Sequence, residues 1–272
     1  MTKRYKAGFL GCGNMGGTLA TVCCTAIGGE NVAVCDVDAA KTAAMAEKYG
    51  CTPVETAELF ASCDYVFLGV KPQYMAAAVG GGDKWVALAK NAGCTVVSMA
   101  AGLEVATIRE MLGGYKGKVI RIMPNLCAKV GEGMILVCGD GHTPEEIAAF
   151  EELLRGAGRF ETLPEKLIDA GCAVSGCGPA YVYMFIEAIA DAGVECGLSR
   201  AAAQALAAQT VLGAAKNVLI SGGNPGALKD AVCSPAGSTI AGVHALEADG
   251  FRGAVMDAIM AAFERNIELK KA

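Results

Sequence analysis

The sequence contains few charged, aromatic and histidine residues. Only 19% of its 272 residues are charged and 6% are aromatic, and it has two histidines. Because no run of Lys or Arg occurs and the formal net charge is −5, we expect no nucleic-acid partner. Hydrophobic residues make up 53% of the chain, which is enough for a large core and too much for a disordered protein. A surface so short of charge predicts burial against another subunit.

Patterns for membranes, secretion and metals are also absent from the sequence. No charge-free apolar stretch reaches the roughly 20 residues that a membrane helix needs, and residues 1–6 are too polar for a secretory signal. The 13 cysteines form no C-x-x-C pair, and His142 and His244 lie far apart in the chain, so we expect no metal site. The thiols are then expected to be reduced core residues of a cytoplasmic protein.

The first 162 residues alternate between strand-like and helix-like patterns. Continuous apolar runs predict buried strands in "YKAGFL", "NVAVCDVD", "CDYVFLGV", "CTVVSMA", "KVIRIM" and "GMILVCG". A helix is expected to open at Thr143, where a capping residue precedes Pro144 and two acidic residues. Apolar runs without alternation are typical of a parallel sheet covered on both faces. The predicted fold class of this part is therefore α/β, with a doubly wound, mostly parallel sheet.

From residue 163 to residue 272 the strand pattern gives way to long, alanine-rich helical stretches. These stretches begin near Glu165, Ser199 and Ser234, and Ser199 is a predicted N-cap. They are apolar on nearly all sides, which indicates burial on most faces, including burial by a partner chain. The sequence therefore predicts two domains, residues 1–162 and residues 163–272.

A glycine motif, "GCGNMG" at residues 11–16, matches G-x-G-x-x-G. The pattern is weak alone, but here it follows a predicted strand and opens a predicted helix, which is the context of a dinucleotide site. Gly11 permits the tight turn, Gly13 lets a pyrophosphate approach the backbone, and Gly16 lets the helix pack on the strand. The alternative is a glycine turn in an unrelated α/β protein.

An acidic residue follows the second predicted strand at the distance that such a site requires. Asp36 lies about 20 residues after Gly16, where a carboxylate accepts hydrogen bonds from the adenosine ribose. A carboxylate there repels a 2′-phosphate, Asp38 adds a second negative charge, and the next basic residue is Lys41. The expected cofactor is NADH or NADPH, with NADH favoured.

A second anion site is expected near the start of the last helical stretch, "SPAGSTIAGVHALE" at residues 234–247. The first N–H groups of a helix lack partners within it, and the helix dipole makes that end positive. A helix opening with Ser238 and Thr239 therefore offers donors to an anion. The alternative is that these hydroxyls merely cap the helix.

Long ordered motifs in both parts resemble one family, pyrroline-5-carboxylate reductase. The likeness runs from about Phe9 to Glu247. It rests on "GCGNMG", "VFLGVKPQ", "RIMPN", "LIDAGCAVSGCGPAYVYMFIEA" and "PGALKDAVCSPAGSTIAGVHALE". The resemblance implies a Rossmann domain followed by an all-helical domain that joins two subunits, in a homodimer or a larger ring of dimers. It also implies hydride transfer from NAD(P)H to the C=N carbon of 1-pyrroline-5-carboxylate, which gives L-proline in the last step of proline biosynthesis.

The resemblance also assigns site residues. The matching position makes Thr239 the catalytic residue, because the family's threonine there hydrogen-bonds the ring nitrogen of the substrate. The substrate residues are Glu165, Ser234, Gly237, Ser238 and Thr239. The cofactor residues are Gly11, Cys12, Gly13, Asn14, Met15, Asp36, Thr56, Val70, Lys71, Pro72, Ala100 and Ala101. Within these sets Glu165 would balance the iminium charge, Lys71 resembles the family's cofactor-side lysine, and Ala100 and Ala101 would touch the nicotinamide. Thr56 stands where an asparagine is usual.

Three other functions stay open. A β-hydroxyacid dehydrogenase shares the two-part plan but needs a catalytic lysine, which "SGCGPAYVYMFIEA" lacks. A reductase of another cyclic imine would use the same residues. A non-catalytic NADH sensor would bind the dinucleotide without turnover, but it would have no use for a carboxylate site at Ser238 and Thr239.

Overall fold

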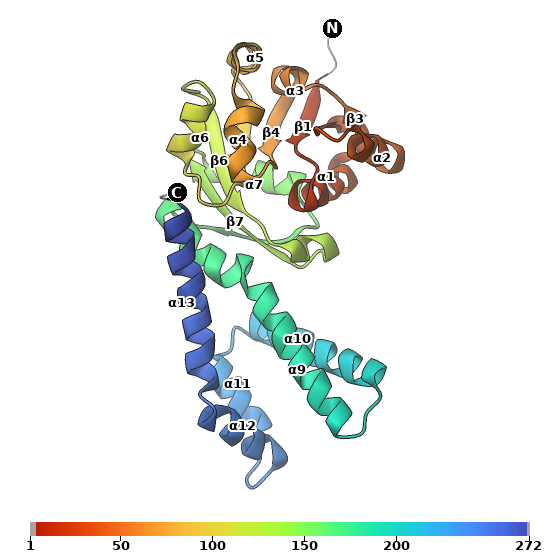
Figure 1. The fold of residues 1–272 in the computed structure, drawn as a ribbon, viewed down its shortest axis with the longest axis vertical. Helices are drawn as coiled ribbons and strands as arrows, with labels where there is room; N and C mark the ends of the chain where they lie inside the picture. Colours follow the sequence, from red (N-terminus) through yellow and green to blue (C-terminus); the bar gives the residue numbers. More distant parts are fainter. Residues whose placement is uncertain (1–3, 271–272) are drawn as a thin grey trace. The chain divides into compact units, whose positions relative to one another are not determined.

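The computed structural model describes residues 4–270, which form two compact units (Figure 1). The first unit contains the chain up to Gly176 together with the segment from Phe263 onward. The second unit contains residues 177–262. The division lies later in the chain than the predicted one at residue 162. The segment from residue 163 to Gly176 packs on the sheet unit, where Ile168 and Cys172 share a hydrophobic cluster with strand residues.

An eight-stranded sheet forms the centre of the first unit, in the order β3-β2-β1-β4-β5-β6-β7-β8. The strands are β1 (Tyr5–Leu10), β2 (Val32–Cys35), β3 (Thr52–Pro53), β4 (Cys63–Leu68), β5 (Thr95–Ser98), β6 (Lys118–Met123), β7 (Gly133–Asp140) and β8 (Gly158–Thr162). Neighbouring strands run parallel except β6 and β7, which are antiparallel. This confirms the predicted, mostly parallel α/β sheet. The short edge strands β3 and β8 were not predicted.

Helices cover both faces of this sheet. They are α1 (Asn14–Ile27), α2 (Ala39–Tyr49), α3 (Thr56–Ser62), α4 (Pro72–Val79), α5 (Gly82–Lys90), α6 (Val105–Met111) and α7 (Pro144–Leu153). One core joins side chains of α1 and α7 to the sheet, with Phe9 stacked on Phe67 at 4.3 Å between ring centroids. A second core joins α3, α4, α5 and α6 to the opposite face. The predicted helix start at Thr143 is confirmed as a capping box with Glu146.

The second unit consists of helices only. They are α9 (Gly178–Glu195), α10 (Arg200–Ser221), α11 (Pro225–Val232), α12 (Ser238–Ala248) and α13 (Phe251–Leu269), whose last turns belong to the first unit. Ser199 caps α10, as predicted, by accepting the N–H of Ala202 at 3.3 Å. The helical stretch expected from Glu165 is interrupted. It passes through a 3₁₀ turn (Glu165–Leu167), α8 (Ile168–Gly171) and a π-helical turn (Cys172–Gly176) before α9 begins with proline in its first turn.

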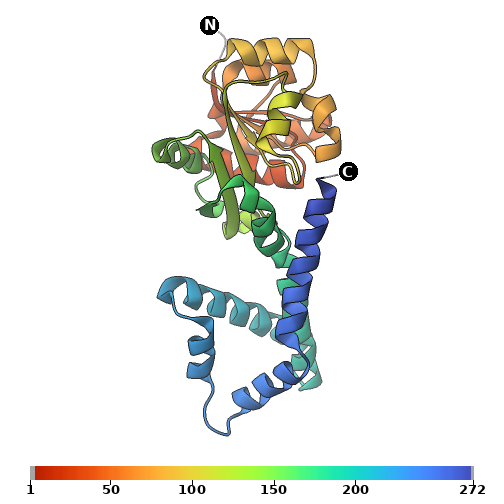
Figure 2. The ribbon, with the colours of Figure 1, turned by 90° about the vertical axis from the view of Figure 1, so that its left-hand side faces the viewer.

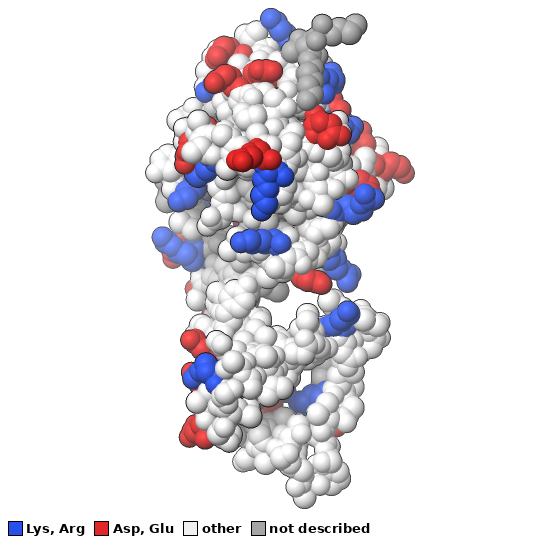
Figure 3. Space-filling view, turned by 90° about the vertical axis from the view of Figure 1, so that its right-hand side faces the viewer, with Lys and Arg blue, Asp and Glu red and all other residues white. Residues whose placement is uncertain are grey.

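The second unit buries little of its own apolar surface. Its hydrophobic cluster of buried residues is built on three alanines, Ala190, Ala203 and Ala207. Figure 2 shows α10 to α13 (blue) arranged as an open frame, and Figure 3 shows few charged side chains over these helices. The segment Glu165–Glu195 is long and apolar enough to cross a membrane by length and composition, which the sequence analysis did not expect. A unit whose core is three alanines needs another apolar surface to cover its exposed leucine, isoleucine and methionine side chains.

Candidate functional site

A cavity lies at the carboxyl edge of the sheet, where the strand order reverses. Strand β1 has β2 on one side and β4 on the other, and in open α/β sheets such a reversal is where ligands bind. The cavity has a volume of about 690 Å³. Its lining comes from the turns after β1, β2 and β4 and from the helices behind them: Leu10, Gly11, Gly13, Cys35, Asp36, Val37, Lys41, Glu55, Thr56, Gly69, Val70, Lys71, Tyr74, Ala77, Ala78 and Lys84.

The glycine turn fits a pyrophosphate. Gly11 has a φ of 95°, and its N–H donates to the Cys35 carbonyl at 2.7 Å, so the turn is tied to β2. A Cβ on Gly16 would overlap the carbonyl oxygen of Gly11, whereas a Cβ on Gly13 would meet nothing within 4 Å. Gly13 is the N-cap of α1, and no described side chain caps this helix. The first N–H groups of α1 therefore have no side-chain cap, and the space beside Gly13 is open, as a phosphate site requires.

Asp36 joins this turn to the end of β2. Its side chain is 8% exposed. Its Oδ2 accepts the N–H of Cys12 at 2.6 Å, and its Oδ1 accepts the N–H of Asp38 at 2.9 Å. Burial, followed by the charge of Asp36, raises the pKa of the Cys12 thiol to about 12, so this thiol stays protonated. Asp36 thus shapes the glycine turn in addition to facing the cavity.

Two lysines enter the cavity that the sequence analysis did not assign to it. Lys41 Nζ lies 3.9 Å from Asp36 Oδ1 and 3.7 Å from Asp38 Oδ2. Lys84 Nζ donates to the Gly80 carbonyl at 3.1 Å, at the end of α4. Lys41 was noticed only as the first basic residue after the acidic pair. Lys84 lies on α5, and only the packing of α4 and α5 brings it here, so no local pattern reveals it.

Half of the predicted cofactor residues line the cavity: Gly11, Gly13, Asp36, Thr56, Val70 and Lys71. Cys12 lies in the glycine turn, Asn14 and Met15 begin α1, and Pro72 begins α4, but these four are not in the lining. Ala100 and Ala101 follow β5 and also lie outside the lining; Ala100 is buried and Ala101 exposed.

Glu165 also belongs to the first unit, and its carboxylate already has partners. Its Oε1 accepts the N–H of Val105 at 2.8 Å and lies 3.4 Å from Nη1 of Arg121. Arg121 and Val105 were not assigned to the site from the sequence. The carboxylate that the resemblance gave to the substrate is therefore shared with a buried guanidinium and a helix start.

The other predicted substrate residues lie in the second unit, around the start of α12. Gly237 is its N-cap, and no described side chain caps the helix, so capping is not the role of Ser238 and Thr239. The N–H of Gly237 donates to the Ser234 carbonyl at 3.1 Å, and a Cβ on Gly237 would overlap Ser234 Oγ. Ser234, Ser238 and Thr239 are exposed. The turn therefore presents hydroxyls beside unpaired N–H groups, which suits a carboxylate.

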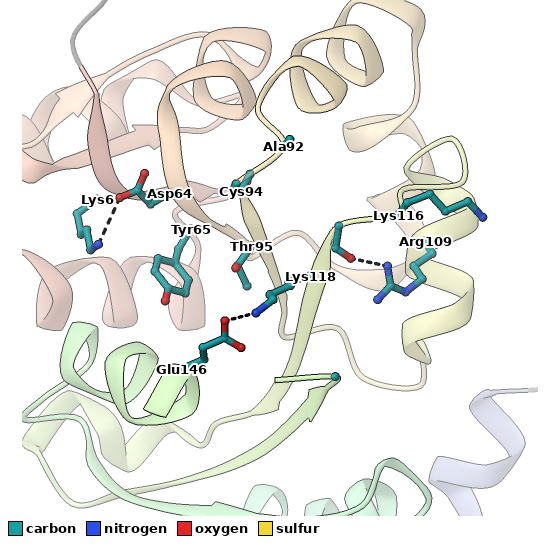
Figure 4. A pocket seen from close by; sticks show the side chains of 13 residues that line it. Lys6, Asp64, Tyr65, Ala92, Cys94, Thr95, Arg109, Lys116, Lys118 and Glu146 are labelled. Carbon is teal, nitrogen blue, oxygen red and sulfur yellow. Dashed lines mark hydrogen bonds and ion pairs between the residues drawn. The ribbon is translucent and has the colours of Figure 1, made fainter. Parts of the chain in front are cut away.

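A different cavity, of about 590 Å³, lies at the amino-terminal edge of the parallel strands (Figure 4). Its cationic side chains are largely engaged by neighbours. Lys6 pairs with Asp64 at 3.3 Å, and Lys118 pairs with Glu146. Arg109 Nη1 donates to backbone carbonyl oxygens at 3.0 and 2.6 Å. Because these cationic side chains are already paired, we do not assign this cavity to the reaction.

Known proteins resemble the chain over nearly its whole length. A family model described as pyrroline-5-carboxylate reductase dimerisation matches residues 165–269, and one described as NADP oxidoreductase, coenzyme F420-dependent, matches residues 6–102. The pyrroline-5-carboxylate reductase of Escherichia coli K12 is 40% identical over 98% of this chain and 99% of that protein. A crystal structure of the Plasmodium falciparum pyrroline carboxylate reductase with NADP bound matches 99% of this chain and 100% of that chain, with a TM-score of 0.84 and 30% identity. The Coxiella burnetii pyrroline-5-carboxylate reductase matches with a TM-score of 0.89 and 27% identity, over 99% of this chain and 100% of that one.

Proposed function

The chain belongs to the pyrroline-5-carboxylate reductase family, and on that premise we propose that it reduces the C=N bond of 1-pyrroline-5-carboxylate to give L-proline. The carrying observation is 40% identity to such a reductase over nearly the full length of both chains. Two features support it in the residues themselves. They are the open glycine turn in the first unit and the uncapped, hydroxyl-rich start of α12 in the second.

The nicotinamide cofactor supplies the hydride, and the residues of the chain bind and orient the cofactor. The first N–H groups of α1 would bind the pyrophosphate beside Gly13, because no side chain occupies that space. Asp36 would accept the ribose hydroxyls with the lone pairs that Cys12 and Asp38 leave free. The cavity around Thr56, Val70 and Lys71 would receive the rest of the nucleotide.

The substrate would be held through its carboxylate and its ring nitrogen. Ser234, Ser238 and the N–H groups at the start of α12 would bind the carboxylate. The Thr239 hydroxyl would orient the nitrogen. A cyclic imine accepts a proton before it binds, so the iminium takes the hydride without a strong acid nearby, and position is the main requirement. Because Arg121 and Val105 already share Glu165 Oε1, we propose that Glu165 acts on the reaction through the loop that it holds.

The test is the loss of reduced-nicotinamide absorbance with 1-pyrroline-5-carboxylate. We expect turnover by the unchanged chain, and a kcat at least about 10-fold lower for Thr239→Val. Thr25→Val is the matched control, since Thr25 lies on α1 and its hydroxyl donates only to the Thr21 carbonyl. Nucleotide binding without turnover would favour the sensor. Turnover only with a six-membered imine would favour the broader imine reductase. Full activity of Thr239→Val would refute the role of that hydroxyl.

We further propose that NADH is preferred over NADPH. Asp36 and Asp38 place two carboxylates beside the ribose position, and Lys41 is shared between them rather than free for a 2′-phosphate. We expect a higher kcat/KM with NADH, and we expect Asp36→Ser to move the preference towards NADPH. Lys41→Ala is the control, and it should leave NADH preferred, because the Lys41 ammonium is shared by the two carboxylates and does not serve a 2′-phosphate. A higher kcat/KM with NADPH for the unchanged chain would overturn the preference and leave the reaction intact.

We propose that residues 163–272 bind substrate and dimerise, in a cytoplasmic homodimer that can assemble further into rings. The matching dimerisation model and the exposed apolar side chains of α9 and α10 support this. Met184 on α9 is 68% exposed, and Val130 in the first unit is 75% exposed. In sedimentation experiments Met184→Glu should shift the chain towards monomer, whereas Val130→Glu should not. An unchanged mass for Met184→Glu would contradict this interface.

A further inference from the structure

A network of charged groups contacts the loop that joins β5 to α6. Arg121, on β6, is fully buried. Its Nη1 lies 3.4 Å from Glu165 Oε1, and its Nη2 lies 3.2 Å from Asp169 Oδ1. Asp169 is 4% exposed at its side chain. An unpaired charge in a protein interior is costly, so Arg121 and Asp169 are stable there only while they lie against each other in a fixed geometry.

The end of α13 completes the network. Lys270 Nζ pairs with Asp169 Oδ2 and lies 3.0 Å from Glu104 Oε1. Asn266 Nδ2 donates to the Asp169 carbonyl at 3.2 Å. These residues belong to the last part of the chain, which returns to the sheet unit after residues 177–262. On its return, the chain contacts the same aspartate that pairs with Arg121.

The two ends of the network meet at the β5–α6 loop. Glu165 accepts the N–H of Val105, the first residue of α6, and Lys270 pairs with Glu104, the residue before it. A Cβ on Gly102 would lie 3.9 Å from the Leu269 carbonyl oxygen. The loop is thus bounded by Glu165 on one side and by the end of α13 on the other.

We propose that the end of α13 is a latch that positions the β5–α6 loop for hydride transfer, with Lys270 as its positioning residue. The proposal rests on the proposed function, because Ala100 and Ala101 in this loop are the assigned contacts of the nicotinamide. Lys270 acts through Glu104 and through Asp169. Asp169 pairs with Arg121, and Arg121 in turn pairs with Glu165. The latch concerns the reacting end of the cofactor, whereas the glycine turn and Asp36 hold the adenosine end.

The kinetic test compares Lys270→Ala with Lys270→Arg and with Arg265→Ala. Arg265 lies in the last turns of α13, just before Lys270, and its ion pair with Glu268 is exposed. For Lys270→Ala we expect kcat to fall about 10-fold, because small displacements of reacting groups cost up to about 100-fold, while the dissociation constant of the nucleotide changes less than about 2-fold. Lys270→Arg should restore kcat, and Arg265→Ala should leave it unchanged. A kcat of Lys270→Ala within about 2-fold of the unchanged chain overturns the proposal.

Amide hydrogen exchange measures how firmly the β5–α6 loop is held, and it does not depend on turnover. In Lys270→Ala the peptide that spans residues 99–108 should exchange faster, while the peptide that spans β1 and the glycine turn should not. Unchanged exchange at residues 99–108 overturns the latch, including for a chain that proves inactive on 1-pyrroline-5-carboxylate. Faster exchange with full kcat overturns the positioning role. If Lys270→Ala fails to fold, Asn266→Ala replaces it, because this variant removes one hydrogen bond to Asp169. Its kcat and its hydrogen exchange at residues 99–108 are then measured and interpreted in the same way.

Discussion

Two glycines of one motif should fail in opposite ways when each is replaced by alanine. A Cβ on Gly16 would come closer to the Gly11 carbonyl oxygen than the 3.0 Å that real Cβ atoms keep, and both groups are backbone. Overpacking of this kind costs about 1–3 kcal/mol, and we expect the upper end because neither group can move alone. A loss of about 3 kcal/mol lowers Tm by roughly 6–12 °C in a chain of this size.

Gly13→Ala should spare the fold and impair the cofactor site. Gly13 has a φ of −72°, which alanine adopts without strain, and its Cβ would meet nothing within 4 Å. Stability should therefore be unchanged or rise by about 0.4–1 kcal/mol. The new methyl group would occupy the space of the pyrophosphate. Loss of one charge-assisted hydrogen bond, worth about 1.5–3 kcal/mol, weakens nucleotide binding about 10- to 150-fold.

Urea unfolding followed by circular dichroism and titration of NADH fluorescence separate the two effects. Gly16→Ala should lower the unfolding midpoint, and Gly13→Ala should lower only the affinity for nucleotide. The reasoning is refuted if Gly13→Ala binds nucleotide normally, or if Gly16→Ala is as stable as the unchanged chain.

Three further outcomes follow from single contacts. Thr143→Ala removes the hydroxyl that accepts the Glu146 N–H, so urea unfolding should show about 1 kcal/mol less stability; no change would mean that the capping box does not hold α7. Asp36→Ala leaves the Cys12 N–H without its acceptor, so the same experiment should show a loss of about 1–3 kcal/mol even without nucleotide, and an effect on binding alone would contradict this. Burial opposes the charge of Lys270, but hydrogen bonds to two carboxylates outweigh it and raise the pKa above the ordinary 10.5. The stabilisation by Lys270 is therefore complete below pH 10.5 and lost as pH rises through the folded-state pKa. The Tm difference between the unchanged chain and Lys270→Ala should shrink across that range, and a constant difference would argue against an ionic contact.

The features that were predicted correctly depend on contacts between residues close together in the sequence. The turn at Gly11 and the N-caps at Thr143 and Ser199 each depend on neighbours within a few residues, and all three are present. Parallel strands were predicted because a strand buried on both faces is apolar throughout. The antiparallel direction of β7 was not predicted, because a buried apolar strand has the same sequence pattern in a parallel and in an antiparallel pair. Strand β3 has two residues, too few for any periodicity.

The missed parts of the site depend on distant partners. The resemblance assigned Glu165 to the iminium charge of the substrate, and nothing near it in the sequence shows that Arg121 lies buried against it. In the sequence, an arginine within a strand only interrupts an apolar run. Its burial can be recognised once its carboxylate partners, here Glu165 and Asp169, are known. Lys84 and Lys270 reach their positions through helix packing and through the return of the chain at Phe263. Such contacts have no signature in a single sequence.

That return gives the chain a particular tolerance to change. Both ends of the segment 177–262 enter the sheet unit, so in topology the helical unit is an insertion into the other. Chain entropy penalises the length of such an insertion only logarithmically, by about 0.6 kcal/mol for each doubling. Helices in it can lengthen or shorten at little entropic cost while Asn266 and Lys270 keep their anchors. A deletion that removes the last turns of α13 would take away part of the sheet unit itself, and expressing residues 1–176 alone would leave Asp169 without Lys270.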